Sequence, residues 1–196
     1  MSIVTLVSGG LDSTLMALLI KEENIEQYPL FINYGQLSFQ HELSSLELNT
    51  KQFHLPKFRI FNLEGYGKLI KSGLTNKGKD IFYDAFLPNR NLFFIINASS
   101  YAYQVGANAV AIGFLNDTNP IFFDQTKNFI EKANQLVSLS LDYKIKFLTP
   151  LIKFTKQEVV HLAKAKGIEN YYSCHKGGKK PCGKCIACKE YNFNKQ

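Results

Sequence analysis

The sequence predicts an α/β fold that is built around a parallel β-sheet. Apolar, β-branched runs typical of buried strands alternate along the chain with segments of helical period. Alternation of this kind favours right-handed crossovers and parallel strands. The first such run, residues 3–7, leads through a glycine turn directly into an apolar helix. With 196 residues, 45% of them hydrophobic, the chain is long enough to bury the core of one such domain.

The other elements can be followed in order along the chain. Strands are predicted at residues 28–34, 58–63, 107–114 and 144–151, and helices at residues 38–54, 92–103 and 122–141. Thr155 and Glu158 have the spacing of a capping box for a further helix, which Gly167 ends and which we interpret as scaffold. Residues 64–89 show no sustained apolar period, and we interpret them as a disordered loop or as a lid over a functional site.

The stretch between the first strand and its helix has the composition of an anion site. It reads Ser8-Gly9-Gly10-Leu11-Asp12-Ser13-Thr14. The two glycines allow a sharp turn and the close approach of a ligand, the hydroxyl groups are donors, and the free N–H groups of a helix's first turn favour negative charge. The stretch contains neither the Walker A pattern nor the dinucleotide-binding glycine pattern. We therefore predict a phosphate or pyrophosphate site of another type.

This loop resembles the pyrophosphate loop (PP-loop), Ser-Gly-Gly-x-Asp-Ser-Thr, of the N-type ATP pyrophosphatases, which split ATP into AMP and pyrophosphate while they adenylate a substrate. The match covers the whole stretch, and the alternative is an ordinary glycine turn between a strand and a helix. The resemblance implies a Rossmann-like three-layer fold of the adenine nucleotide alpha-hydrolase type that uses ATP and Mg²⁺. It also implies an ATP-binding segment made up of Val7, Ser8, Gly9, Gly10, Leu11, Asp12, Ser13, Thr14, Leu15, Met16 and Ala17.

Two further segments lie where a nucleotide would bind. Tyr34 and Gln36 follow the second predicted strand, at the carboxyl end where open parallel sheets bind ligands, and we interpret them as adenosine contacts or as part of a simple turn. Arg90 precedes the helix at residues 92–103 and lies between Asn89 and Asn91, either of which can cap this helix. An arginine there can hold a phosphate or a carboxylate through two hydrogen bonds, and we favour this role over a surface arginine beside a cap.

Polar residues after the strand at residues 107–114 are candidates for the substrate site. Asn116 and Asp117 lie in the loop that follows this strand, at the same edge of the sheet as Ser8, and Asp124 comes soon after. Their side chains could contact the substrate or magnesium. An acidic turn residue and a helix N-cap are equally good interpretations.

All the cysteines of the chain lie near its C-terminus. They are Cys174, Cys182, Cys185 and Cys188. Four thiolates that include two consecutive C-x2-C steps indicate a tetrahedral zinc site rather than disulfides, and a redox C-x-x-C pair is the alternative. Because four thiolates leave no open coordination position, the predicted Zn²⁺ is structural, with one ion per chain. We predict a main domain at residues 1–170 and a zinc-binding tail at residues 171–196.

The net charge of +7 comes almost entirely from lysine. Several lysines surround the cysteines, and a zinc-ribbon module that binds nucleic acid is therefore an alternative function. The absence of aromatic residues between Cys174 and Cys188 argues against base stacking there. No apolar run approaches the ~20 residues that span a bilayer, and no signal-peptide pattern opens the chain. We expect a cytoplasmic protein without a membrane partner.

Together, the two ends of the chain resemble the 7-cyano-7-deazaguanine synthase (QueC) family of the queuosine pathway. The similarity covers nearly the whole chain, because it includes Asn33-Tyr34-Gly35-Gln36, Leu87-Pro88-Asn89-Arg90-Asn91 and Thr149-Pro150-Leu151. It implies a ligase that adenylates the carboxylate of 7-carboxy-7-deazaguanine, forms an amide with ammonia, and dehydrates the amide to the nitrile after a second activation. The resemblance implies Asp12, Ser13 and Arg90 as catalytic residues, and Arg90 and Asn91 as residues that help to position ATP or the acyl group. It also implies a homodimer.

One segment departs from the family pattern. Residues 116–124 stand where the family carries a Tyr-Ser-Gly-Tyr-Pro-Asp-Cys-Arg-like segment around the deazaguanine. This leaves open a relative that adenylates another carboxylate, or one that attaches the activated base to a macromolecule. A thiouridine-forming tRNA enzyme of the same superfamily could be supported by a catalytic cysteine outside the zinc set, and the sequence has none.

Overall fold

The computed structural model describes residues 1–115 and 122–191. Within these ranges, five strands form one sheet in the order β3-β2-β1-β4-β5, and every neighbouring pair is parallel. The strands are β1 (Ser2–Leu6), β2 (Glu26–Asn33), β3 (Arg59–Asn62), β4 (Ala109–Ala111) and β5 (Lys146–Leu148). β4 and β5 are shorter than the strands predicted at residues 107–114 and 144–151. The predicted parallel α/β fold is confirmed.

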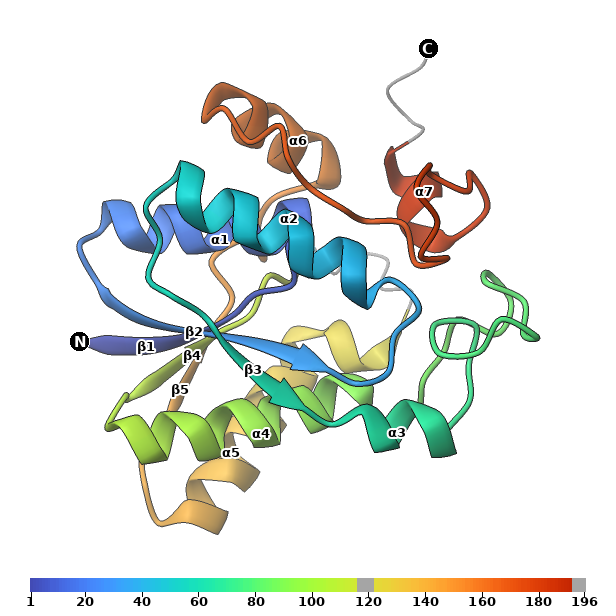
Figure 1. The fold of residues 1–196 in the computed structure, drawn as a ribbon. Helices are drawn as coiled ribbons and strands as arrows, with labels where there is room; N and C mark the ends of the chain where they lie inside the picture. Colours follow the sequence, from blue (N-terminus) through green and yellow to red (C-terminus); the bar gives the residue numbers. More distant parts are fainter. Residues whose placement is uncertain (116–121, 192–196) are drawn as a thin grey trace.

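Helices cover both faces of the sheet (Figure 1). One face carries α1 (Leu11–Glu22), α2 (Phe39–Gln52) and α6 (Lys156–Ala165), and the other carries α4 (Arg90–Val105) and α5 (Lys127–Leu141). Two short helices lie toward the carboxyl ends of the strands: α3 (Glu64–Leu69), which follows β3, and α7 (Ile186–Tyr191) in the C-terminal tail. The arrangement has the three layers that the sequence predicts.

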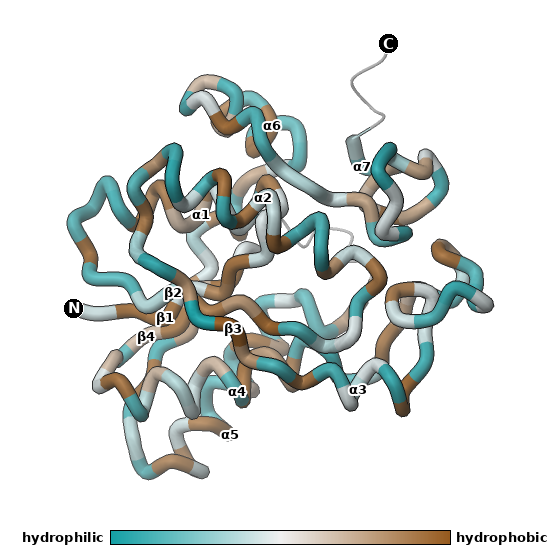
Figure 2. Tube along the Cα trace, viewed as in Figure 1, coloured by the Kyte–Doolittle hydropathy of each residue, from teal (hydrophilic) through white to brown (hydrophobic). Residues whose placement is uncertain are grey.

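The centre of the sheet is buried because its side chains alternate between the two helical layers. Ile3 packs with α1 and α6, whereas its neighbour Val4 packs with α4 and α5. The central strands β1 and β4 accordingly lie in the brown, apolar middle of the trace in Figure 2. β3 differs, because all of its residues are exposed at the edge of the sheet.

The helix predicted at residues 122–141 begins later, at Lys127. Residues 123–125 form a 3₁₀ turn, and Thr126 is the N-cap, whose hydroxyl accepts a hydrogen bond from the Phe129 N–H. Such a cap satisfies one of the free N–H groups of a first helical turn and so determines where the helix starts.

The segment at residues 64–89, interpreted from sequence as a disordered loop or a lid, folds as α3 followed by a series of turns. Its side chains Leu74, Ala85 and Leu87 are buried. The segment is therefore part of the packed domain, and its role as a lid stays a prediction.

The C-terminal tail packs against the loop between β1 and α1. The Tyr172 N–H donates a hydrogen bond to the Gly9 carbonyl (3.1 Å), and the Tyr172 ring stacks on His41 of α2 with 4.9 Å between ring centroids. The Ser45 hydroxyl of α2 contacts the carbonyls of Gly9 (2.8 Å) and Asn170 (3.2 Å). The tail, α2 and the glycine loop therefore form one connected unit at the carboxyl edge of the sheet (Figure 1).

Candidate active site

A cavity opens at the carboxyl ends of β1 and its two neighbours in the sheet. From β1 the chain continues to β2 and β3 on one side of β1, and it then crosses to β4 and β5 on the other side. This reversal makes the edge at β1 the topological switch point, where open α/β sheets bind ligands. The cavity has two adjoining compartments, of about 380 Å³ and about 240 Å³. Cavities of this size suit small-molecule ligands. Both compartments are lined by Ser8, Glu42, Arg90, Gly113, Phe114 and His175.

The loop after β1 has a tightly constrained geometry. Gly9 has a φ of 72°, and a Cβ atom there would lie 2.2 Å from the Glu42 carbonyl oxygen, so only glycine fits. The Ser13 hydroxyl accepts a hydrogen bond from the Ser8 N–H (3.1 Å) and donates one to the Gly10 carbonyl (3.2 Å). The loop therefore presents a preorganised backbone to the cavity, as an anion site requires.

We expect Gly9→Ala to destabilise the protein. The new methyl group would overlap the backbone of α2 in a left-handed conformation, at a cost of about 2 kcal/mol or more. In a domain of this size, that cost lowers the midpoint of thermal unfolding by about 4 °C or more. The matched control is Gly65→Ala, because a Cβ at Gly65 meets no atom within 4 Å. Equal midpoints for the two variants would contradict this account of the loop.

Part of the predicted ATP-binding segment reaches the cavity, and part lies beneath it. The lining residues are Val7, Ser8, Gly10, Leu11, Asp12 and Ser13. Leu15, Met16 and Ala17 are buried in the hydrophobic core. Thr14 is also buried, and its hydroxyl accepts a hydrogen bond from the Asn49 amide (3.4 Å). These four side chains position the helix behind the loop.

Tyr34 and Gln36 line the smaller compartment, together with Phe31 and Phe94. Gln36 also holds the turn after β2, because its side-chain carbonyl accepts from the Tyr34 N–H (2.9 Å) and its amide donates to the Glu42 carboxylate (3.0 Å). Burial raises the pKa of Tyr34 to about 12. The aromatic lining suits the flat face of a nucleotide base.

Arg90 is the first residue of α4 and lines both compartments. Asn89 before it is in the left-handed region with a φ of 56°, and its side chain makes no capping hydrogen bond. Asn91 lines the smaller compartment, and its amide donates to the Asp124 carbonyl (3.4 Å). Arg90 is therefore placed to contact a ligand in either compartment.

The helix α6 contributes Lys156, which the sequence analysis missed. The predicted capping box of Thr155 and Glu158 is present and places Lys156 in the first turn of α6. Lys156 Nζ lies 2.8 Å from both carboxylate oxygens of Asp12 and 4.4 Å from the centroid of the Tyr191 ring. Burial opposes the charge of Lys156, but the Asp12 carboxylate raises its pKa. The scaffold interpretation of α6 was therefore incomplete, because the helix brings a cation to the loop.

The predicted substrate residues are only partly within the structure. Asn116 and Asp117 lie outside the described residues. Asp124 is in the 3₁₀ turn before α5, and it is the next residue, Gln125, that lines the cavity.

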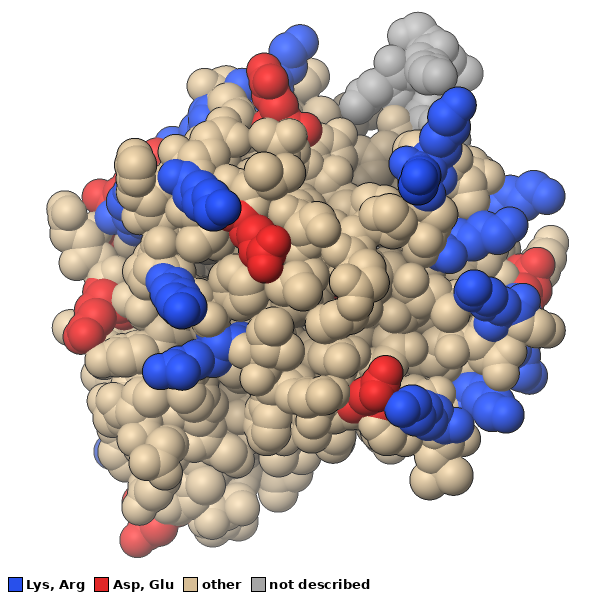
Figure 3. Space-filling model, in the orientation of Figure 1, with Lys and Arg blue, Asp and Glu red and all other residues tan. Residues whose placement is uncertain are grey.

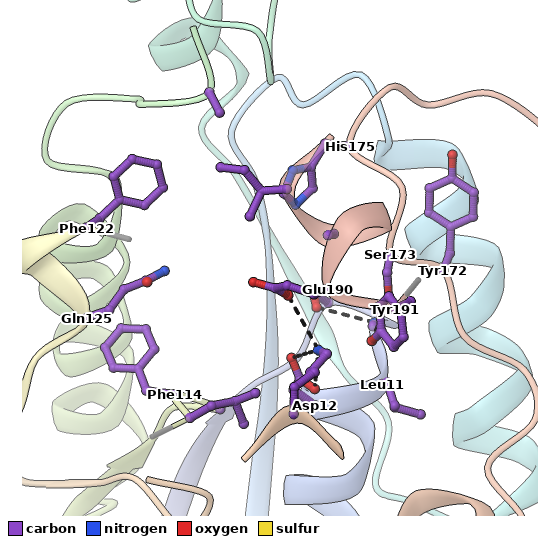
Figure 4. Close-up of a pocket in the computed structure, with 18 of the residues that line it drawn as sticks. Leu11, Asp12, Phe114, Phe122, Gln125, Tyr172, Ser173, His175, Glu190 and Tyr191 are labelled. Atoms are coloured by element: carbon purple, nitrogen blue, oxygen red, sulfur yellow. Dashed lines mark hydrogen bonds and ion pairs between the residues drawn. The ribbon is translucent and has the colours of Figure 1, made fainter. Parts of the chain in front are cut away.

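Two walls face each other across the larger compartment (Figure 4). One comes from the segment after β4 and consists of Phe114, Phe122 and Gln125; the other comes from the tail and includes Tyr172, Ser173, His175, Glu190 and Tyr191. Burial lowers the pKa of His175 to about 4, so its imidazole is neutral near pH 7. The tail is therefore part of the site as well as a candidate metal centre.

The four cysteine thiols gather in the tail. Their sulfur atoms all lie within 4.8 Å of one another, and those of Cys182 and Cys188 are 3.9 Å apart. A tetrahedral ion with metal–sulfur bonds of about 2.3 Å places its sulfur ligands about 3.8 Å apart, so the cluster could hold such an ion. Burial opposes ionisation of the Cys182 thiol, but N–H groups of Cys185 and Lys184 lower its pKa to about 7.

Lysines gather around the tail and the loop after α3 (right in Figure 3). The exposed ones are Lys68 in the last turn of α3, Lys71, Lys77 and Lys79 in the loop, and Lys176, Lys179, Lys180, Lys184 and Lys189 in the tail. Lys189 Nζ lies 3.6 Å from the centroid of the Phe82 ring, a contact that joins the two segments. A positive rim of this kind attracts anions by long-range steering, and the attraction weakens as salt increases.

The chain matches one protein family over nearly its whole length. The model of the family described as "Queuosine biosynthesis protein QueC" matches residues 2–193. The 7-cyano-7-deazaguanine synthase of Methanobrevibacter smithii is 31% identical over 204 residues, which cover 94% of this chain and 88% of the relative. The 7-cyano-7-deazaguanine synthase of a Prochlorococcus marinus strain is 31% identical over 207 residues, which cover 97% of this chain and 92% of the relative.

Solved structures of other proteins share the fold. The U34-tRNA thiolase NcsA from Methanococcus maripaludis has a TM-score of 0.62 at 18% identity, covering 97% of this chain and 63% of the thiolase. A 4-thiouridine synthetase in complex with RNA and ATP has a TM-score of 0.54 at 19% identity, covering 98% of this chain and 49% of the synthetase. The chain spans less than two thirds of either protein, and similarity at this level of identity shows the fold alone.

Proposed function

Because this chain belongs to the queuosine biosynthesis protein QueC family, we propose that it is a 7-cyano-7-deazaguanine synthase. In the proposed reaction, ATP adenylates the carboxylate of 7-carboxy-7-deazaguanine, ammonia converts the acyl-adenylate to an amide, and a second activation with dehydration gives the nitrile. The observation that carries this proposal is the convergence of the glycine loop, Lys156 and Arg90 on one cavity at the switch point of the sheet.

We assign the adenosine of ATP to the smaller compartment and its phosphates to the loop. The aromatic side chains of Phe31, Tyr34 and Phe94 suit a base, and Ser8 and Ser13 lie where this compartment meets the loop. The first turn of α1 begins there with Leu11 and offers free N–H groups to the phosphates. The larger compartment is then left for the carboxylate substrate.

Asp12 and Lys156 have complementary roles in this proposal. In the free protein they neutralise each other at 2.8 Å. Carboxylate oxygens are ligands that Mg²⁺ prefers, so Asp12 fits the magnesium ion that accompanies ATP and neutralises phosphate charge. Lys156 then contacts the departing pyrophosphate, while Arg90 holds the α-phosphate or the substrate carboxylate.

The protein contributes position and charge, and the substrates supply the nucleophiles. A carboxylate oxygen attacks the α-phosphorus of ATP, and pyrophosphate leaves. Ammonia attacks the acyl carbon, loses a proton, and displaces AMP, which keeps one former carboxylate oxygen. The amide oxygen attacks a second ATP in the same way. Loss of the second AMP and of the two amide protons leaves the nitrile.

We propose that the cysteine cluster holds one structural Zn²⁺. The mutual distances of the thiols fit a tetrahedral ion, and four sulfur ligands leave no open position for catalysis. The ion would hold together the tail, which we propose spans residues 171–196 beside a main domain of residues 1–170. The described part of the tail packs on the loop after β1 and forms a wall of the larger compartment. It would therefore act on the reaction through the shape of the site.

We further propose a cytoplasmic homodimer. Free, clustered thiols fit a reducing compartment. Ile60 and Phe61 on the edge strand β3 are exposed apolar side chains that a second copy of the chain would cover. In residues 1–115 and 122–191, no helix is both long and apolar enough to cross a bilayer.

The proposal is tested by incubating the protein with ATP, magnesium, 7-carboxy-7-deazaguanine and ammonium. We expect AMP, pyrophosphate and the nitrile, detected by mass spectrometry, and we expect Asp12→Ala to slow pyrophosphate release by about 100-fold or more. AMP formation with a different carboxylate, or with a macromolecular acceptor, would overturn the assigned substrate but keep adenylation. Unchanged turnover of the Asp12 variant would remove Asp12 from the site.

A further inference from the structure

The larger compartment contains a carboxylate that the adenylation steps do not use. Glu190 of α7 faces the cavity between its two walls (Figure 4). Its side chain is 39% exposed, and its oxygen lies 3.8 Å from Lys156 Nζ, beyond ordinary hydrogen-bond distance. Lys156 therefore forms only a long ion pair with Glu190, whereas it makes hydrogen bonds of 2.8 Å to both carboxylate oxygens of Asp12. A partly buried carboxylate with acceptor capacity to spare is expected to take hydrogen bonds from a ligand.

The surroundings of Glu190 suit a flat heterocycle. Figure 4 shows the Phe114 and Phe122 rings on the opposite wall, with the Gln125 amide between them, and Tyr191 lies beside Glu190. Aromatic rings stack on heterocyclic bases of every kind. These rings therefore add affinity but do not distinguish one base from another. The Gln125 amide carries both donors and an acceptor and can meet a ring carbonyl. Asp12, Lys156 and Arg90 are assigned to ATP and the substrate carboxylate, and the Glu42 carboxylate already accepts hydrogen bonds from Gln36 and Ser38. Glu190 is therefore the charged group that is left to select the ring.

We infer that Glu190 binds the N–H at position 1 and the 2-amino group of the substrate's base, and so makes the site specific for guanine-type heterocycles. The inference rests on the proposed function, which places the substrate's carboxylate at the loop. The ring system of the substrate then lies between the two walls of the larger compartment. An ionised carboxylate accepts two parallel hydrogen bonds from a guanine-type edge. An analogue without the 2-amino group lacks one of these donors, and an adenine-type edge lacks the N–H as well.

Glu190→Gln tests this inference, because glutamine keeps the shape but replaces one acceptor with a donor. For the wild type, we expect kcat/KM for 7-carboxy-7-deazaguanine to exceed that for its 2-desamino analogue by about 10- to 100-fold, the effect of one charged hydrogen bond. In the variant, we expect this preference to fall below about 3-fold and KM for 7-carboxy-7-deazaguanine to rise about 10- to 100-fold, with KM for ATP unchanged. The matched control is Glu169→Gln, because Glu169 is exposed and does not line the cavity.

A variant that keeps the wild-type preference would overturn the inference. An equal rise in KM for ATP would also overturn it, because Glu190 would then act through Lys156. Calorimetric binding of the two bases without ATP separates this test from the proposed function. If the wild type binds the guanine-type base selectively, the variant loses this selectivity, and no turnover is seen, the role of Glu190 is supported and the proposed synthase activity is overturned. If turnover is seen but the wild type does not bind selectively, the synthase activity is supported and the role of Glu190 is overturned.

Discussion

Lys156→Met is expected to lower kcat/KM for ATP by about 100- to 1,000-fold, the usual effect of losing one preorganised charge at a developing anion. The substitution removes the cation beside the phosphates and leaves Asp12 without its counter-charge. Methionine keeps most of the apolar stem that packs near Tyr191, so the fold should persist. Steady-state rates of pyrophosphate release measure the effect, and thermal unfolding of the same samples checks the fold.

The matched control is Lys153→Met, because Lys153 is exposed on the same segment and does not line the cavity. Lys156→Arg separates charge from geometry, and we expect it to recover part of the lost activity because the charge remains. The loss of an oriented charge should lower activity far more than about threefold. A folded Lys156→Met protein with activity within about threefold of the wild type would therefore show that Lys156 does not contact the phosphates.

Cys185→Ser is expected to remove the bound metal, destabilise the tail and abolish adenylation. In small zinc-binding peptides the apparent binding free energy of about 10–16 kcal/mol is folding free energy, because the unfolded chain has no preformed site. The tail has little else to order it, since Ile81 and Tyr172 are the larger apolar side chains packed against its cysteines. Loss of the tail would open one wall of the cavity and remove the Tyr172 contact to Gly9. Activity should therefore fall together with stability, without selective loss of the chemical step.

Metal content by mass spectrometry, together with thermal unfolding with and without a strong chelator, measures this effect. We expect one zinc ion per chain in the wild type and in Lys184→Ala, which changes an exposed side chain of the same turn. The structural zinc would be eliminated, and the redox alternative favoured, if the wild-type protein is metal-free, has four titratable thiols, and unfolds at the same temperature with and without the chelator.

Much of the fold could be predicted because its signals are local. The apolar run before Ser8, the glycine loop and the capping box at Thr155 each place an element within a few residues. The predicted start of α5 was wrong, and the reason is also local. Phe122 and Phe123 extend the apolar pattern, but the Thr126 hydroxyl caps the helix behind them.

The site was harder to predict because its contacts join distant parts of the chain. Lys156 and Asp12 are 144 positions apart, and no local pattern links them. A usable signal existed, since Lys156 opens a helix after the last strand, at the edge of the sheet that carries the loop. Glu190 reaches the cavity only because the tail folds back over the loop. The cysteines were found because their spacing is local.

The fate of the substrate's carboxylate oxygens is the most direct test of the central claim, which is adenylation in the cavity at the glycine loop. The measurement uses 7-carboxy-7-deazaguanine labelled with oxygen-18 at both carboxylate positions, with ATP, magnesium and ammonium, and mass spectrometry of the nucleotide products. Because each activation transfers one carboxylate oxygen to phosphorus, the account predicts that every AMP formed carries a single heavy oxygen and that pyrophosphate carries none. Nitrile formed with unlabelled AMP, or with the label in inorganic phosphate beside ADP, would contradict it.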